Sequence, residues 1–152
     1  MSNRQYAVMF ALLLGSTAIV APSYAAEQTM QEQSLYHRLG GYDAIAAVTD
    51  EFIGRLTSDP QFARFFTSLS TDSKLRLRQL VVDQLCAATG GPCIYIGRTM
   101  KQAHKGLGIT KAEWDRSAEH LAASLDKFRV GTREKKEVLA AVTTLEPEIV
   151  EK

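Results

Sequence analysis

The sequence predicts an all-α domain, and three observations point to that class. Apolar residues recur at intervals of three and four, which is the period of a helix with one buried face. Glycine pairs, prolines and capping residues separate these stretches, as they do between helices of modest length. No stretch alternates apolar and polar residues over the length of a strand, and the sequence contains no internal repeat.

The first 25 residues have the pattern of a secretory signal peptide. Arg4 precedes an apolar run over residues 6–20, and small residues follow up to Ala25 and Ala26. The run is shorter than the ~20 residues of a spanning helix, which favours cleavage over the alternative of an uncleaved anchor. We therefore expect a periplasmic or secreted protein with no stable membrane span, a flexible segment at 26–33 and one folded domain at 34–152.

The charge of the chain excludes one class of partner. The sequence has 18 basic and 17 acidic residues, and no block of one sign stands out. Nucleic-acid binding normally needs a basic surface that attracts phosphates. The composition therefore predicts a protein that does not bind nucleic acid.

The first half of the domain predicts a short helix and two long ones. Ser34 can cap a short helix that ends at Gly40 and Gly41. The first long helix runs from Asp43 to about Thr57 and stops before Asp59 and Pro60, and the second covers Asp72–Ala88. Gly90, Gly91 and Pro92 end this second helix, because glycine and proline both interrupt helical backbone.

The second half begins with an extended loop and a brief helical piece that contains Met100 and His104. Thr110 and Glu113 have the spacing of a capping box, which predicts the start of another long helix. Thr132 can cap a last helix that ends near Pro147.

The two cysteines, Cys86 and Cys93, leave two interpretations open. They flank the glycine-proline turn, and an oxidising compartment would allow a disulfide between them. The alternative is one small buried apolar residue and one exposed thiol. No Cys-x-x-Cys-His motif is present, which argues against a covalently attached c-type heme.

His104 is the strongest candidate for a metal ligand. It follows Met100 by four residues and precedes Leu107 by three, so the three side chains share one side of a short helix. By this spacing alone, a histidine packed into the core is the more common outcome. His37 and His120 have mainly polar neighbours and are expected at the surface, and no histidine pair has the spacing of a zinc helix.

One ordered set of residues carries a resemblance to a known family. The set consists of Ser34-Leu35-Tyr36, Leu39-Gly40-Gly41, Asp59-Pro60, Phe65-Phe66, Gly90-Gly91-Pro92, Tyr95, Gly97, Arg98, Met100, Ala103-His104 and Gly108-Ile109-Thr110. Together these residues resemble the group I truncated hemoglobins over about residues 34–145. The resemblance implies a two-over-two helical sandwich that encloses heme b, with His104 as the proximal ligand of the iron.

The resemblance also implies which side chains surround the heme. The cofactor-binding residues would be Phe66, Leu77, Val81, Tyr95, Arg98, Met100, His104 and Ile109. Among them, Tyr95, Met100 and Ile109 match positions in the wall of the heme pocket, and the Tyr95 hydroxyl can also lie near a heme propionate. Arg98 is our candidate for a propionate partner; the alternative is a basic residue that is only solvated after a loop.

The distal pocket departs from the family pattern. Its residues would be Phe52, Ile53, Leu77 and Val81, and Ile53 stands where many members have a tyrosine that donates a hydrogen bond to oxygen. Gln84 lies on the same helical stripe as Val81 and can replace that donor if it turns inward; alternatively, it bonds to nearby backbone away from the heme.

Three functions compete at this point. The leading one is a heme protein that reversibly binds oxygen, nitric oxide or carbon monoxide, for binding or transport of oxygen, with a reductase of unidentified kind. The second is a heme enzyme that detoxifies nitric oxide or reduces a small nitrogen or peroxide species, and such chemistry usually needs distal polar groups. The third is a heme-free helical binding module in which His104 is an ordinary core residue.

Overall fold

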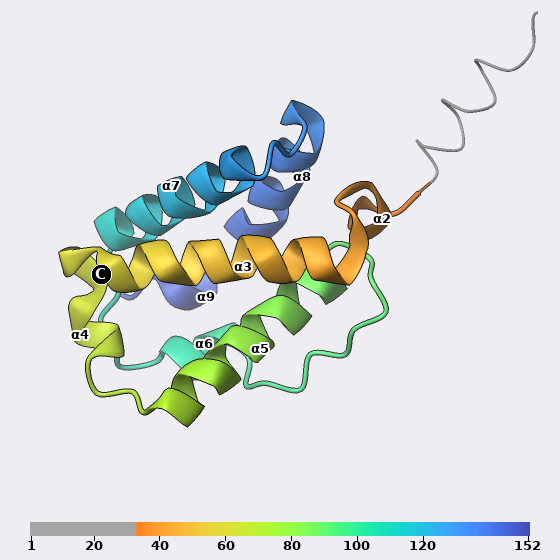
Figure 1. Cartoon of the computed structure of the whole chain (residues 1–152). Coiled ribbons are helices and arrows are strands. Elements are labelled where there is room, and N and C mark those ends of the chain that lie inside the picture. The colour runs from red at the N-terminus through yellow and green to blue at the C-terminus, as the bar shows by residue number, and fades with distance from the viewer. Residues whose placement is uncertain (1–32) are drawn as a thin grey trace, which may run out of the picture. The chain divides into compact units, whose positions relative to one another are not determined.

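The computed structural model describes residues 33–152 and shows an α-helical domain, with no strand among these residues (Figure 1). The fold class predicted from the sequence is therefore confirmed. The predicted signal peptide at 1–25 and nearly all of the segment at 26–33 lie outside the described residues.

Long helices alternate with short ones along the chain. In order, they are α2 (Leu35–Arg38), α3 (Gly41–Ser58), the 3-10 turn η1 (Pro60–Phe62), α4 (Ala63–Phe66), α5 (Thr71–Ala88), α6 (Met100–His104), α7 (Lys111–Lys127), α8 (Thr132–Thr143) and α9 (Glu146–Ile149). A long loop over residues 89–99 joins α5 to α6.

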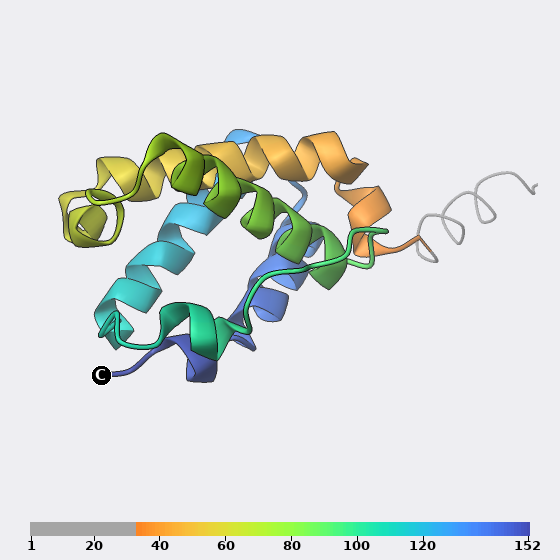
Figure 2. The ribbon, with the colours of Figure 1, turned by 90° about the horizontal axis from the view of Figure 1, so that it is seen from below.

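Four helices form two pairs that pack on each other. Helix α3 contacts both α5 and α7, and α7 also contacts α8. The α3–α5 pair therefore meets the α7–α8 pair through α3 and α7, which is a two-over-two arrangement (Figure 1). Seen from below, the chain leaves α5 through the long loop and reaches α6, which lies beside α9 (Figure 2).

Two clusters of buried residues hold the pairs together. One joins α3 to α5 through Ile45, Ala46, Val82 and Cys86. The other joins α3 to α7 and α8 through Val48, Leu121, Leu125 and Val138. Helix α3 contributes to both clusters because its buried face is wide, with Ala46 and Val48 on opposite edges and Ile45 between them.

Most helix starts agree with the sequence-based predictions, and two details differ. The Thr110–Glu113 capping box is present at the start of α7. Thr132, however, is the first residue of α8, and Gly131 occupies the capping position without a side-chain bond. Pro147 lies within α9 rather than after the last helix, because proline has no N–H to lose in the first turn.

A disulfide joins Cys86 at the end of α5 to Cys93 in the long loop, and their Cα atoms are 5.7 Å apart. It closes the turn that contains Gly91. A side chain at Gly91 would collide with the Cys86 sulfur and the Tyr36 ring, which a Cβ atom would approach to 2.7 and 2.4 Å. Of the two interpretations left open by the sequence, the structure has the disulfide.

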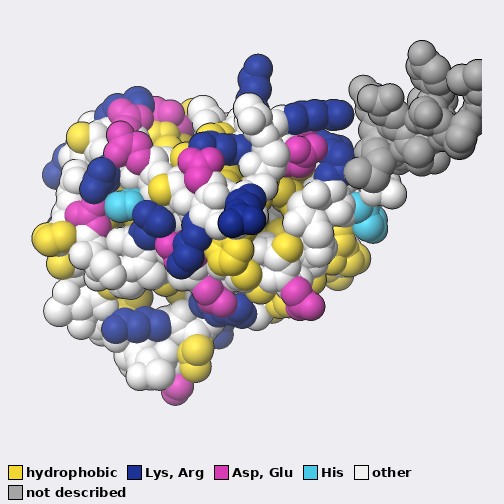
Figure 3. All heavy atoms as spheres, turned by 45° about the horizontal axis from the view of Figure 1, so that its top comes forward, with side chains coloured by type: hydrophobic (Ala, Val, Ile, Leu, Met, Phe, Trp, Pro, Cys, Tyr) yellow, Lys and Arg dark blue, Asp and Glu magenta, His cyan; other side chains and the backbone are white. Residues whose placement is uncertain are grey.

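One face of the domain is charged but mixed in sign. Basic and acidic side chains alternate over the face seen in Figure 3, without a large area of one sign. Within residues 33–152, no helix combines the length and the apolar character needed to cross a membrane.

Candidate cofactor site

The local structure of α6 fixes the tautomer and the orientation of the His104 ring. Thr99 caps the helix by accepting a hydrogen bond from the Gln102 N–H at 3.2 Å. His104 is the last residue of α6, and its Nδ1 lies 2.7 Å from the Met100 carbonyl oxygen. A carbonyl oxygen can only accept, so Nδ1 carries the hydrogen and Nε2 keeps the free lone pair. This is the tautomer that a metal-ligating histidine uses, with its second nitrogen held by a backbone acceptor.

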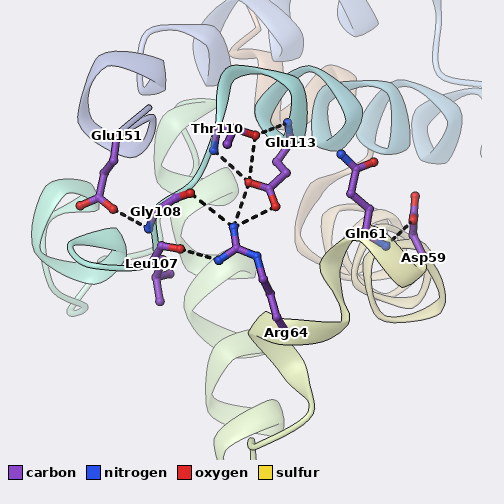
Figure 4. A network of polar contacts seen from close by, with 8 residues as sticks. All are labelled: Asp59, Gln61, Arg64, Leu107, Gly108, Thr110, Glu113 and Glu151. Atoms are coloured by element: carbon purple, nitrogen blue, oxygen red, sulfur yellow. Dashed lines mark hydrogen bonds and ion pairs between the residues drawn. The ribbon is translucent and has the colours of Figure 1, made fainter.

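The loop that follows His104 is held by two charged side chains (Figure 4). Glu151 accepts the N–H groups of Gly106 and Gly108, at 2.7 and 2.6 Å. These two backbone donors lower the pKa of the Glu151 carboxyl. From the other side, Arg64 donates to the carbonyl oxygens of Leu107 and Gly108, at 2.7 and 3.3 Å.

Glu113 connects this loop to α7. Its carboxylate accepts from the Thr110 N–H at 2.9 Å and from Arg64 at 2.9 and 3.0 Å. Burial alone would raise the pKa of this carboxyl, but the Thr110 N–H and the Arg64 guanidinium outweigh that effect and lower it. Arg64 also stacks on Phe65, 4.0 Å from the ring centre. A single arginine on α4 thus fixes both the loop after His104 and the start of α7.

The loop before α6 is fixed differently. The Tyr95 hydroxyl donates to the Arg98 carbonyl at 2.8 Å, and its ring covers Gly97, where a Cβ atom would come within 2.4 Å of the ring. Burial raises the pKa of the Tyr95 phenol. The Arg98 side chain is exposed. The roles of Tyr95 and Arg98 as propionate partners remain predictions.

The uncharged side chains predicted to surround the heme are all buried to a similar extent. All are half-buried, and none belongs to the fully buried core. They are Phe66 on α4, Leu77 and Val81 on α5, Tyr95 in the loop, Met100 on α6 and Ile109 after it. Because these side chains lie outside the core, part of their apolar surface is still exposed. A flat apolar cofactor could cover that surface, which would stabilise the complex by about 25 cal/mol for each Å² buried.

The predicted distal residues are also half-buried. Phe52 and Ile53 come from α3, and Leu77, Val81 and Gln84 from α5, which packs against it. Phe52 additionally lies against the core shared by α3, α7 and α8. No hydrogen bond to another group in residues 33–152 engages the Gln84 side chain, so its amide is not held away by nearby backbone.

The other two histidines have partners of their own. The His37 Nδ1 lies 2.8 Å from the Ser34 hydroxyl at the exposed start of α2. His120 Nε2 lies 2.8 Å from the Asp59 carboxylate, which Arg116 also contacts at 3.0 Å. The Gln61 N–H, His120 and Arg116 lower the pKa of Asp59 from 3.8 to about 2. His120 is more buried than the sequence suggested, because its side chain is only 13% exposed.

An apolar cavity of about 160 Å³ lies elsewhere, and Ile45, Val48, Leu121, Leu125 and Val138 line part of it. It contains no histidine, and its walls are the core itself. Among the described residues, the surroundings of His104, whose Nε2 lone pair is free to bind a metal, are therefore a better candidate for a cofactor site than this cavity.

Sequence reasoning missed Arg64 and Glu151. Their contacts with the loop after His104 span 43 to 45 residues of sequence. A local pattern of residues cannot reveal such partners, and neither residue belongs to a motif.

Comparisons with known proteins point to one family. A family model of bacterial-like globins matches residues 34–151. A group 1 truncated hemoglobin of Mycolicibacterium paratuberculosis is 39% identical over 116 residues, which cover 76% of this chain and 83% of that protein. Another, from Tetrahymena pyriformis, is 32% identical over 98 residues, which cover 64% of this chain and 78% of that protein.

Solved structures show the same arrangement of helices. The truncated hemoglobin of Tetrahymena pyriformis in its Fe(III) form aligns with a TM-score of 0.72 at 28% identity, covering 79% of this chain and 100% of that one. A 2/2 hemoglobin from Synechococcus, solved in the cyanomet state with covalently attached heme, aligns with a TM-score of 0.71 at 27% identity and the same coverage.

Proposed function

Because the chain belongs to the bacterial-like globins, and within them to the group 1 truncated hemoglobins, we propose that it binds oxygen reversibly at a heme iron held by His104. Membership in this family makes the chain a heme globin that binds a diatomic gas. The choice of oxygen and the residue assignments are the parts that we propose. The heme-free helical module considered from the sequence does not agree with a heme family.

The contact between His104 Nδ1 and the Met100 carbonyl, 2.7 Å long, is the observation that carries the proposal. It fixes the tautomer whose Nε2 can donate to iron, and it limits rotation of the ring. When bound, heme supplies a ferrous iron with a coordination position for a diatomic gas.

The remaining site residues bind and shield the cofactor. In this proposal, Phe66, Met100 and Ile109 would cover the macrocycle with apolar surface, and Tyr95 and Arg98 would be the propionate partners. Apolar walls keep water away from the iron, which favours reversible binding of a gas over its reduction.

The distal residues favour ligand binding over turnover. Ile53, Leu77 and Val81 have no hydrogen-bond donor and cannot move a proton. An enzyme that consumes nitric oxide or reduces peroxide requires groups that steer oxygen or protons. Only Gln84 offers a donor on this stripe, so we do not propose an enzymatic role.

The signal-like sequence at 1–25 supports a periplasmic or secreted location, where a reductase would return ferric iron to the ferrous state. This location is part of the proposal. It can be tested by fractionating cells that express the full sequence and determining the mature amino terminus by mass spectrometry.

Absorption spectroscopy tests the gas-binding proposal directly. Protein made with ample heme should show a ferrous spectrum that changes under oxygen and returns when oxygen is removed by vacuum or argon. The same sample should form a carbon monoxide complex. Rapid oxidation to the ferric form, without a reversible oxygen spectrum, would contradict oxygen binding as the function.

A further inference from the structure

Helix α6 is too short to be rigid by itself. It has five residues, whereas isolated helices shorter than about 12 residues are marginal even with good helix formers. The direction of the His104 side chain therefore depends on contacts that α6 and its flanking loops make with the rest of the domain.

The last residues of the sequence supply several of these contacts. Helix α9 packs beside α6, and Glu148 accepts the Lys101 N–H at 3.3 Å. Beyond the other end of α6, the Glu151 carboxylate accepts the N–H groups of Gly106 and Gly108. One short segment thus reaches both ends of the helix that carries His104.

Backbone bonds keep Glu151 in place. Its own N–H donates to the Ile109 carbonyl at 2.8 Å, and the Lys111 N–H donates to the Lys152 carbonyl at 3.1 Å. The segment therefore lies along the loop between α6 and α7, so the Glu151 carboxylate approaches from a fixed direction.

Two charges of opposite sign then hold the same short loop. The Glu151 carboxylate accepts hydrogen bonds from N–H groups of the loop, and the Arg64 guanidinium donates to the carbonyl oxygens of Leu107 and Gly108 (Figure 4). Gly106 and Gly108 have φ of 84° and 60°, a region that other residues rarely adopt. Because glycine is flexible, such a loop keeps one conformation only when outside contacts fix it.

We propose that Glu151 is a positioning residue for the proximal ligand: by fixing the loop after α6, it fixes the orientation of the His104 imidazole toward the iron. This inference rests on the proposed function, in which His104 is the iron ligand. Arg64 acts from the opposite side of the loop, but it also neutralises the buried Glu113, so Glu151 is the better residue to change.

The test uses heme-loaded protein with Glu151→Gln, and Glu146→Gln as the matched control. Glu146 lies in the same segment and faces Lys111 at 3.6 Å, without a bond to the loop after α6. Each carboxylate oxygen of Glu151 accepts one of the two N–H groups, and glutamine replaces one of these oxygens with an NH2 group that cannot accept and carries no charge. Since Glu151 is exposed, its replacement leaves the core intact.

Three readouts report on the proposal. In the ferrous protein, the iron–histidine stretching band in resonance Raman spectra should shift or broaden in Glu151→Gln. Heme transfer to a scavenging protein should accelerate by roughly three- to tenfold, the range that corresponds to the net loss of one ordinary hydrogen bond. In the diamagnetic carbon monoxide complex, the Gly106 and Gly108 amides should exchange faster. Glu146→Gln should match the wild type in all three.

Failure of this proposal can be distinguished from failure of the proposed function. If Glu151→Gln keeps the wild-type Raman band, heme transfer rate and amide exchange, the positioning role is wrong. Faster amide exchange with an unchanged Raman band would also overturn it, because the role would then be structural only. If His104→Ala keeps the wild-type iron–histidine band, the ligand assignment itself is wrong.

Discussion

The two sides of the proposed heme site are built on different principles. On the proximal side, a five-residue helix and its loops are fixed by hydrogen bonds from the charged side chains of Arg64, Glu113 and Glu151. On the distal side, two helices of 18 residues each present Ile53, Leu77 and Val81, which offer only apolar surface. Long helices hold their side chains by packing, whereas a short helix needs specific partners. We therefore expect the proximal side to control cofactor retention and the distal side to control ligand choice.

Removal of His104 should have the largest effect, because it takes away the centre of the proximal side. His104→Ala should lose most of its heme during purification, as judged by the ratio of Soret to protein absorbance. His120→Ala is the matched control, since that histidine contacts Asp59 instead. Equal heme content in the two variants would show that the iron ligand lies elsewhere.

Cutting the disulfide should loosen the connection between the two sides. The Cys86–Cys93 bond ties the distal helix α5 to the loop that leads into α6. Closing a loop this short stabilises a fold by about 2 to 3 kcal/mol, mainly by restricting the unfolded chain. Cys93→Ser should lower the free energy of unfolding by that amount in urea titrations of the carbon monoxide complex.

A reductant should destabilise the wild type to a similar extent and leave Cys93→Ser unchanged. Identical urea midpoints for the wild type and the variant would mean that the disulfide contributes no stability.

A donor added to the distal side should change ligand binding without affecting heme retention. The oxygen complex of ferrous heme is polar, and a hydrogen bond to a charged acceptor is worth roughly 1.5 to 3 kcal/mol. Ile53→Tyr should therefore slow oxygen dissociation by about tenfold or more, because each ~1.4 kcal/mol is a factor of ten. Carbon monoxide dissociation, measured by stopped flow beside it, should change much less.

Size must be separated from polarity in this experiment. An enlarged side chain in a filled pocket can cost about 1 to 3 kcal/mol of stability, so Ile53→Phe is the control and melting temperatures accompany the kinetics. If Ile53→Tyr folds normally and oxygen dissociates as in Ile53→Phe, then residue 53 does not face the ligand or Gln84 already donates to it.

The smallest effect is expected at Asp59, away from both sides of the site. Its pKa is lowered from 3.8 to about 2, so its charge stabilises the fold above pH 3.8 and this contribution disappears as the pH falls toward 2. Asp59→Asn should melt at a lower temperature than the wild type at pH 6, and the difference should vanish near pH 2. Asp115→Asn, an exposed carboxylate beside Lys111, should show a smaller difference at pH 6.

Much of the fold could be predicted because helices are encoded locally. The long helices predicted at Asp43–Thr57 and Asp72–Ala88 occur at Gly41–Ser58 and Thr71–Ala88. The capping box at Thr110 also follows from spacing alone. The details at Thr132 and Pro147 were wrong because the first residue of a helix depends on how the preceding turn enters it, which sequence spacing does not determine.

A site residue could be proposed from the sequence only where few residue types can perform the chemistry, and that assignment stays a prediction. His104 could be selected because few side chains can ligate iron, and its neighbours repeat at helical spacing. The sequence gives no hint that its Nδ1 faces the Met100 carbonyl, since that depends on the ring rotamer. Arg64 and Glu151 look like ordinary surface charges until the fold brings them to the same loop.

The position of the disulfide also bears on how the chain matures. With only two cysteines in the sequence, a single intramolecular pairing exists, whereas four cysteines would allow three. The partners are seven residues apart, so they remain near each other even before the long helices assemble. Oxidation of the two thiols within one chain therefore gives the native bond directly, since no incorrect intramolecular pairing exists to be reshuffled.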